Sequence, residues 1–230
     1  MKENLLKLII WDFDGVIADS EKLWLKNRME ILNRDYGLNW DFETVNKHLG
    51  GMSDKTKRIV LQNMGIILKD DFEEESLKLD YISMAKEMKA TPGVENIFKT
   101  LSIKQCIATG GLYEKTIDKI KAVNFEKFFS KQNIFTADMV EHGKPEPDLF
   151  LLAAEKMKEK PENCLVVEDS IAGMTAAIRA KIPVAAFLGS EIYHSSAYKK
   201  QVENLGIKDI FYNMDELKVF LEKKLSQAKA

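Results

Sequence analysis

Residues 8–15 read LIIWDFDG, an apolar run that ends in two aspartates and a glycine. Four consecutive apolar residues are typical of a strand buried on both faces, as in a parallel sheet. Asp12 and Asp14 follow at the point where this strand ends. Short apolar runs recur at residues 105–108, 134–135, 164–167 and 184–187, with helical patterns at 114–123, 148–157, 170–180 and 217–225. The alternation predicts an α/β fold, a parallel sheet with helices on both faces.

The composition excludes several classes of protein. The 230 residues carry a formal net charge of −2. The chain therefore lacks the excess of basic residues that is typical of a nucleic-acid-binding protein. No apolar run approaches the roughly 20 residues of a membrane helix, so we expect no membrane association. Cys106 and Cys164 lie in separate apolar runs, which predicts buried free thiols and a cytoplasmic protein. A monomer is the default expectation.

Between residues 18 and 89 only helical patterns are found. The first is expected to begin with Ser20 as its N-cap and to stop at Gly37. Further helices are expected at 41–49, 54–64 and 70–88, with Ser53 as the cap of the second of these. A turn signal at Thr91-Pro92-Gly93 closes the block. The predicted domains are an α/β core of residues 1–17 and 90–230 and an inserted helical domain of residues 18–89.

Polar residues follow several of the predicted strands. In open α/β sheets the ligand crevice lies beyond the carboxyl ends of the strands, so these residues are candidates for a site. Besides the two aspartates, they are Thr109-Gly110-Gly111 after the second strand, Gly143-Lys144-Pro145 before the fourth, and Glu168-Asp169 after the fourth.

This set of residues suits phosphoryl transfer. The ionised carboxylate of Asp12 could attack phosphorus, and Asp14 could protonate the leaving oxygen and then deprotonate water. Asp12 and Asp169 offer hard oxygen ligands for Mg²⁺. Thr109, the amides of Gly110 and Gly111, and Lys144 would hold phosphate oxygens.

Each feature alone also has a simpler interpretation. A carboxylate after a strand often caps a turn or a helix, two glycines often only form a turn, and a lysine before proline usually lies in solvent. Their joint placement after successive strands favours the catalytic interpretation.

The segment DFDGV (residues 12–16), followed in order by Thr109-Gly110, Gly143-Lys144-Pro145 and Glu168-Asp169-Ser170, resembles the haloacid dehalogenase-like superfamily over essentially the whole chain. Within it the chain is similar to β-phosphoglucomutase-like sugar phosphatases, including the 6-phosphogluconate phosphatase type. The resemblance implies a Rossmann-like doubly wound parallel sheet core with an inserted α-helical cap domain.

The resemblance also implies roles for individual residues. Asp12 would be the phosphoaspartyl nucleophile and Asp14 the general acid and base, while Thr109 and Lys144 would bind phosphate. Mg²⁺ would lie on the Asp12 carboxylate, the backbone carbonyl of Asp14 and Asp169, with Glu168 close by.

The cap loop, residues 50–55, would help to choose the leaving group. Candidates for substrate specificity are Trp24, Gly51, Met52, Asp54 and Lys55. The related mutases place an arginine for a second phosphate where this chain has Asp54, and a histidine where it has Trp24. Because an acidic residue would repel a second phosphate, the expected reaction is hydrolysis of a small phosphorylated metabolite, a sugar or sugar-acid phosphate.

Three alternatives remain open. A sugar-phosphate mutase would pass the phosphoryl group to a second hydroxyl instead of water. The dehalogenases of the superfamily lack the second aspartate, and Asp14 is present. A non-enzymatic, phosphorylatable binding protein would need no inserted cap. Residues 191–200, with Tyr193, His194 and Tyr198, are expected to form an exposed loop and helix and have no assigned chemical role.

Overall fold

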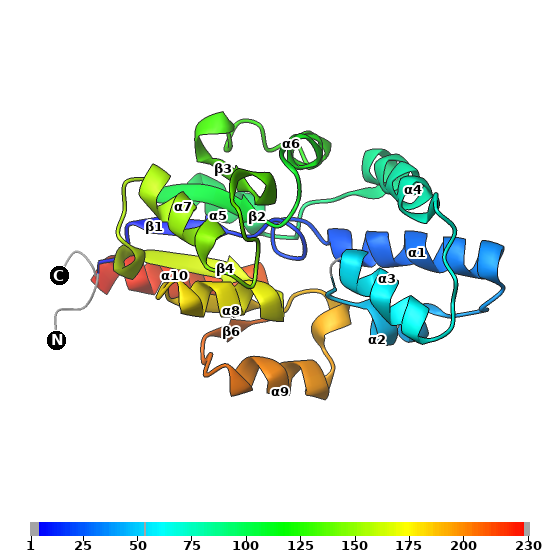
Figure 1. Ribbon diagram of the computed structural model, residues 1–230. Coiled ribbons are helices and arrows are strands. Elements are labelled where there is room, and N and C mark those ends of the chain that lie inside the picture. Colours follow the sequence, from blue (N-terminus) through cyan, green and yellow to red (C-terminus); the bar gives the residue numbers. More distant parts are fainter. Residues whose placement is uncertain (1–4, 53, 228–230) are drawn as a thin grey trace. The chain divides into compact units, whose positions relative to one another are not determined.

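The computed structural model describes residues 5–52 and 54–227 (Figure 1). The chain divides into two compact units, one of residues up to 18 together with those from 89 onward, and one of residues 19–88. The first unit contains a six-stranded parallel sheet. Its strands are β1 (Leu8–Trp11), β2 (Lys104–Thr109), β3 (Ile134–Thr136), β4 (Cys164–Glu168), β5 (Val184–Phe187) and β6 (Ile210–Phe211).

The strand order is β3-β2-β1-β4-β5-β6, with all neighbours parallel. This order confirms the predicted doubly wound α/β fold, and it puts the first strand of the sequence in the middle of the sheet. The helices of this unit are α5 (Val94–Thr100), α6 (Tyr113–Ala122), α7 (Asp148–Lys156), α8 (Ile171–Arg179), α9 (Ser196–Asn204) and α10 (Met214–Gln227). Short 3₁₀ turns are η1 (Lys131–Asn133), η2 (Ala137–Met139), η3 (Pro161–Asn163) and η4 (Glu191–Tyr193).

Burial on both faces explains why β1 is apolar throughout. Leu8 and Ile10 belong to a core cluster that includes residues of α7 and α8. Trp11 packs on the other face, where its ring meets that of Phe98 in α5 edge-on at 5.4 Å. Because successive side chains of a strand point to opposite faces, a central strand needs apolar residues at every position.

Two elements of this unit have no counterpart among the predicted ones. Helix α5 has 7 residues and strand β6 has 2, both too short for a clear periodic pattern. Phe98 in α5 contacts the rings of Phe125, Phe128 and Phe129, so this short helix organises an aromatic cluster. The thiols of Cys106 and Cys164 are buried and unpaired, as predicted.

The second unit consists of α1 (Ser20–Tyr36), α2 (Phe42–Leu49), α3 (Asp54–Asn63) and α4 (Phe72–Glu87). Helix α1 ends at Gly37 as predicted, with φ of 64° and its N–H donating to the carbonyl of Asn33. The predicted N-cap is wrong: Asp19 precedes the helix, and Ser20 is its first residue, fully buried. Ser53, the expected cap of α3, lies outside the described residues.

A buried polar network joins α1 to α4. Arg28 forms two hydrogen bonds to Asp80, of 2.7 and 3.1 Å, and the two side chains are 5% and 1% exposed. Asn27 donates to the same carboxylate at 3.0 Å and accepts from Ser83 at 2.9 Å. Since buried charges need full pairing, this network fixes the register of the two helices.

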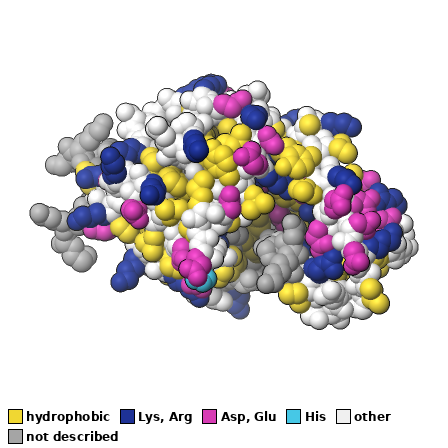
Figure 2. Space-filling model, turned by 45° about the horizontal axis from the view of Figure 1, so that its top comes forward, with side chains coloured by type: hydrophobic (Ala, Val, Ile, Leu, Met, Phe, Trp, Pro, Cys, Tyr) yellow, Lys and Arg dark blue, Asp and Glu magenta, His cyan; other side chains and the backbone are white. Residues whose placement is uncertain are grey.

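The surface of the described residues carries charges of both signs beside exposed apolar side chains. On the face shown in Figure 2, lysine and arginine side chains lie among acidic ones, and hydrophobic side chains gather over its middle. Within the described part of the chain, every helix is too short or too polar to cross a membrane.

Replacing Asp80 with alanine tests the buried network. The Asp80→Ala variant leaves the Arg28 guanidinium buried without its carboxylate, so we expect the free energy of unfolding to fall by about 3–5 kcal/mol. Urea denaturation followed by circular dichroism measures this loss. Arg34→Ala removes an exposed pair with Glu75 and should leave the urea midpoint nearly unchanged. Equal midpoints for both variants would contradict the importance of the network.

Candidate active site

At the carboxyl ends of β1 and β4, two carboxylates contact a lysine from a separate loop. Asp12 continues the strand pairing, its N–H donating to the carbonyl of Val167 at 2.9 Å. Lys144, from the loop before α7, places its Nζ 2.5 Å from Asp12 Oδ1 and 2.7 Å from Glu168 Oε2. All three side chains are at least nine-tenths buried. The structure therefore brings together three residues that are far apart in the sequence.

Asp169 joins this group to form a cluster of three buried carboxylates. One oxygen each of Asp12, Glu168 and Asp169 lies within 4.8 Å of the other two. The three residues are 5%, 1% and 2% exposed. Such a set of hard oxygen atoms is the kind that Mg²⁺ prefers.

The cluster is electrostatically strained. Burial, followed by the charge of Glu168, raises the pKa of Asp12 to about 7, although Lys144 acts in the opposite direction. Burial, followed by the charges of Glu168 and Asp12, raises the pKa of Asp169 well above its usual value. Burial by itself would lower the pKa of Lys144, but Asp12 and Glu168 outweigh it and raise that pKa. One lysine thus does not balance three carboxylates, and the cluster is suited to a further cation.

Glu168 is held by donors on both of its oxygens. Oε2 accepts from Lys144, while Oε1 accepts from the N–H and the hydroxyl of Ser170 at 3.0 and 2.7 Å. Ser170 in turn caps α8, since its Oγ accepts from the N–H of Gly173 at 3.0 Å. A Cβ on Gly173 would lie 2.1 Å from Glu168 Cδ, so glycine is required for this close approach. Glu168 therefore orients Lys144 toward Asp12.

Asp14 occupies a different environment from Asp12. Its side chain is 28% exposed and accepts from Lys119 Nζ of α6 at 2.5 Å. Lys119 is only 2% exposed, and its Nζ lies 4.8 Å from the centre of the Phe13 ring. Gly15, with φ of 80°, follows; a Cβ there would lie 1.6 Å from Asp169 Oδ2. The turn after β1 thus packs its backbone directly against the Asp169 carboxylate.

Lys119 was not among the predicted site residues. A lysine on an amphipathic helix normally lies on the solvent face. The helical spacing of the sequence places Lys119 on the apolar face of this helix. That face is buried and is formed by Thr116, Lys119, Ile120 and Val123. A single lysine within such a stripe indicates a buried partner, here Asp14.

The loop after β2 offers a hydroxyl and glycine backbone. Thr109 is the last residue of β2 and is 1% exposed. Its Oγ1 accepts from the N–H of Gly111 at 3.3 Å. A Cβ added to Gly110 would meet no atom within 4 Å, so this loop leaves open space beside the strand end. Helix α6 begins three residues after Gly110, at Tyr113.

The predicted specificity residues belong to the helical unit. Trp24 is buried in α1 at 7% exposure. Gly51 is exposed and donates its N–H to Glu21 Oε1 at 3.2 Å, and Met52 is half-buried. Asp54 and Lys55 begin α3, and their side chains lie outside the described part of the structure.

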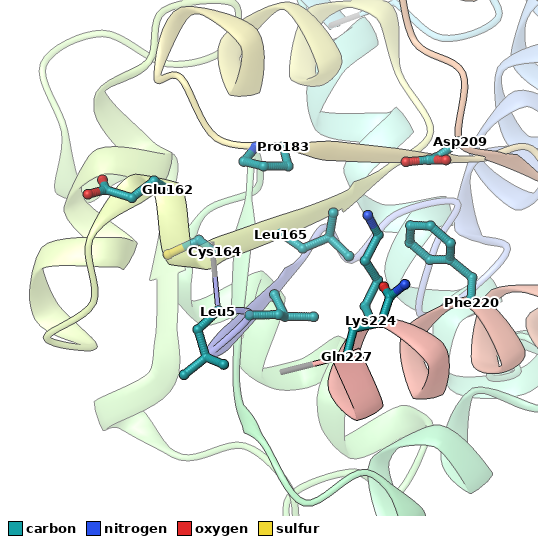
Figure 3. A pocket seen from close by; sticks show the side chains of 10 residues that line it. Leu5, Glu162, Cys164, Leu165, Pro183, Asp209, Phe220, Lys224 and Gln227 are labelled. Carbon is teal, nitrogen blue, oxygen red and sulfur yellow. The ribbon is translucent and has the colours of Figure 1, made fainter. Parts of the chain in front are cut away.

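A separate cavity of about 350 Å³ lies at the opposite end of the sheet, beside the amino ends of β1 and β4 (Figure 3). Leu5, Leu165 and Phe220 contribute apolar walls, and Lys224 of α10 points into the same region (Figure 3). Because the carboxylates follow the strands, this cavity is not part of the site.

Comparison with known proteins identifies the family of the chain. Residues 9–187 match the family model described as haloacid dehalogenase-like hydrolase. The chain is 27% identical to the phosphorylated carbohydrates phosphatase of Thermotoga maritima, covering 77% of this chain and 82% of the relative. It is 24% identical to the 6-phosphogluconate phosphatase of Escherichia coli, covering 79% of this chain and 82% of that protein.

A solved structure shares the fold over nearly the whole chain. It is a conserved haloacid dehalogenase-like protein from Agrobacterium tumefaciens, with a TM-score of 0.86 and 25% identity, covering 95% of this chain and 98% of that one. The family match spans the strands that carry Asp12, Thr109 and Glu168. The chain therefore belongs to the haloacid dehalogenase-like hydrolases.

Proposed function

We propose that the protein is a Mg²⁺-dependent phosphomonoesterase that hydrolyses a small phosphorylated metabolite, a sugar or sugar-acid phosphate, through an aspartyl-phosphate on Asp12. The observation that carries this proposal is the contact of Lys144 with Asp12 beside two further buried carboxylates. A lysine and a cation next to a carboxylate allow it to approach an anionic phosphate, which would otherwise repel it.

The donor set fits Mg²⁺. The carboxylates of Asp12 and Asp169 and the backbone carbonyl of Asp14 would hold the ion. Glu168 already accepts hydrogen bonds on both oxygens, so we assign it to orienting Lys144. Bound there, Mg²⁺ would supply positive charge that offsets the repulsion between carboxylate and phosphate.

Asp12 and Asp14 have different roles in the proposed reaction: Asp12 forms the covalent bond, and Asp14 transfers protons. A carboxylate oxygen of Asp12 forms a bond to phosphorus while the ester P–O bond breaks, and protonated Asp14 gives its proton to the leaving oxygen. Asp14 then takes a proton from the water that attacks the aspartyl-phosphate. Inorganic phosphate leaves, and the Asp12 carboxylate is restored. Thr109, the amide of Gly110 and Lys144 would hold the phosphate oxygens during both steps.

Substrate choice is assigned to the helical domain of residues 18–89. The residues of the phosphoryl-transfer chemistry all belong to the α/β unit, so the helical unit is free to select the leaving group, through Trp24, Gly51, Met52, Asp54 and Lys55. The names of the two relatives, a phosphorylated carbohydrates phosphatase and a 6-phosphogluconate phosphatase, support a sugar or sugar-acid phosphate. The acidic Asp54 supports water as the acceptor in place of a phosphorylated sugar.

Phosphate release from a panel of phosphorylated metabolites tests the proposal. The panel contains hexose phosphates, 6-phosphogluconate, glycerol phosphates and phosphoglycolate, and a parallel assay follows isomerisation of β-glucose 1-phosphate. We expect release from sugar or sugar-acid phosphates. Isomerisation without release would overturn hydrolysis in favour of a mutase, and inactivity in both assays would argue against catalysis on these substrates.

Asp12→Asn isolates the nucleophile within that panel. A carboxamide is a poor nucleophile, so we expect the rate to fall at least about a thousandfold. Asp118→Asn, on the exposed face of α6, is the matched control and should retain the wild-type rate. Near-normal turnover by Asp12→Asn would refute the aspartyl-phosphate.

Lys119→Met tests the ion pair that holds Asp14. Methionine keeps the apolar stem, but it leaves the Asp14 carboxylate without this cation. We expect kcat to fall roughly tenfold to a hundredfold, since a displacement of about 1 Å can cost a hundredfold in rate. Lys121 is exposed on the same helix, so the Lys121→Met variant should keep the wild-type kcat. Equal kcat values for the two variants would show that Lys119 does not act through Asp14.

Removal of divalent cations tests the metal. We expect EDTA to abolish phosphate release, and added Mg²⁺ to restore it and to raise the melting temperature, because a ligand of the native state stabilises it. The Asp169→Asn variant should lose the rise in melting temperature. Full activity in the absence of any divalent cation would exclude the proposed role of Mg²⁺.

A further inference from the structure

The segment after β5 makes contacts that the sequence did not indicate. Residues 188–198 contain η4 and the start of α9, and contrary to expectation Tyr193 is only 4% exposed. His194 Nε2 donates to the carbonyl of Leu188 at 3.1 Å, which closes this loop on itself. Ser195 caps α9, its Oγ accepting from the N–H of Tyr198 at 3.1 Å. The two tyrosines are therefore held on a well-defined support.

Tyr198 and Tyr193 both interact with Asp169. Tyr198 Oη donates to the backbone carbonyl of Asp169 at 2.7 Å. A hydrogen bond from the Tyr193 side chain lowers the pKa of the Asp169 carboxyl, against the effect of burial. The two rings lie against each other, with centroids 4.8 Å apart and planes inclined by 35°. One tyrosine thus holds the main chain of Asp169 and the other holds its side chain.

The backbone of Gly15 limits Asp169 from another direction. The position of a Cβ at Gly15 falls 1.6 Å from Asp169 Oδ2, so the carboxylate rests directly on this turn. Tyr198 holds the main chain of Asp169, while the Tyr193 hydrogen bond and the Gly15 backbone restrict its carboxylate. Partners of this kind, which hold a metal ligand in its orientation, typically contribute 10–100-fold to metal affinity.

We propose that Tyr193 and Tyr198 are positioning residues for the metal ion, and that they set its affinity by fixing the orientation of Asp169. The inference rests on the proposed function, in which Asp169 is a metal ligand. Neither tyrosine is assigned to contact the substrate or the reacting atoms. Their effect is on the occupancy of the site, so it is overcome at high Mg²⁺ concentration.

The test is direct metal binding by variants that lose a single hydroxyl. Mn²⁺ serves as the probe, because the electron paramagnetic resonance signal of the free ion reports the dissociation constant without turnover. We expect Tyr193→Phe and Tyr198→Phe each to weaken Mn²⁺ binding about tenfold. At saturating Mg²⁺ the kcat of both variants should return to near the wild-type value.

Three controls separate the possible failures. Tyr212→Phe alters a neighbouring exposed tyrosine, whose ring contacts His194, and should bind Mn²⁺ like the wild type. Thermal unfolding of the metal-free proteins detects a merely structural effect, which would lower the melting temperature and leave the dissociation constant unchanged. Asp169→Asn should lose Mn²⁺ binding.

The outcomes are distinct. If Asp169→Asn loses the ion while both tyrosine variants keep wild-type affinity, the inference is overturned and the proposed metal site stands. If Asp169→Asn binds Mn²⁺ as tightly as the wild type, or the wild type binds none, the proposed metal site fails and the inference fails with it. Weakened binding confined to the tyrosine and Asp169 variants supports both.

Discussion

The burial of three carboxylates beside Lys144 constrains much of the α/β unit. Taking a charged group out of water costs several kcal/mol unless partners replace the lost hydration. Lys144 lies between Asp12 and Glu168, and Ser170 serves the remaining oxygen of Glu168. These partners come from the loop before α7 and the first residue before α8, so the central position of β1 and β4 is needed to bring them together.

The two aspartates of the first turn form ion pairs with different lysines. Asp12 is buried against Lys144, whereas Asp14 is partly exposed and paired with Lys119. Two carboxylates with different surroundings can take different parts in one reaction, which is how a single site performs both nucleophilic and acid–base chemistry. The pairing with two separate lysines explains how residues two positions apart in the sequence remain chemically distinct.

Much of the sheet and of the central site follows from local sequence pattern. The apolar runs mark β1, β2, β3, β4 and β5, and the polar residues that follow these strands or end them include Asp12, Thr109 and Glu168. Other features depend on contacts that no local pattern carries. The ion pair of Lys119 with Asp14 spans 105 residues, and the hydrogen bond from Tyr198 to Asp169 spans 29. Ser20 looks like an N-cap by residue type, but its burial in α1 decides against that position.

The polar core of the helical unit has a consequence for how such proteins diversify. The buried pair of Arg28 and Asp80, and the pair of Lys57 and Glu21, find these partners within residues 19–88. A substitution that breaks one of these pairs leaves a charge unmatched within the same unit. The proposed function assigns leaving-group preference to this unit, so selection can act on that preference in one part of the gene while the residues proposed for phosphoryl transfer are inherited unchanged. Gene duplication followed by drift in this segment offers a short evolutionary route from one phosphorylated substrate to another.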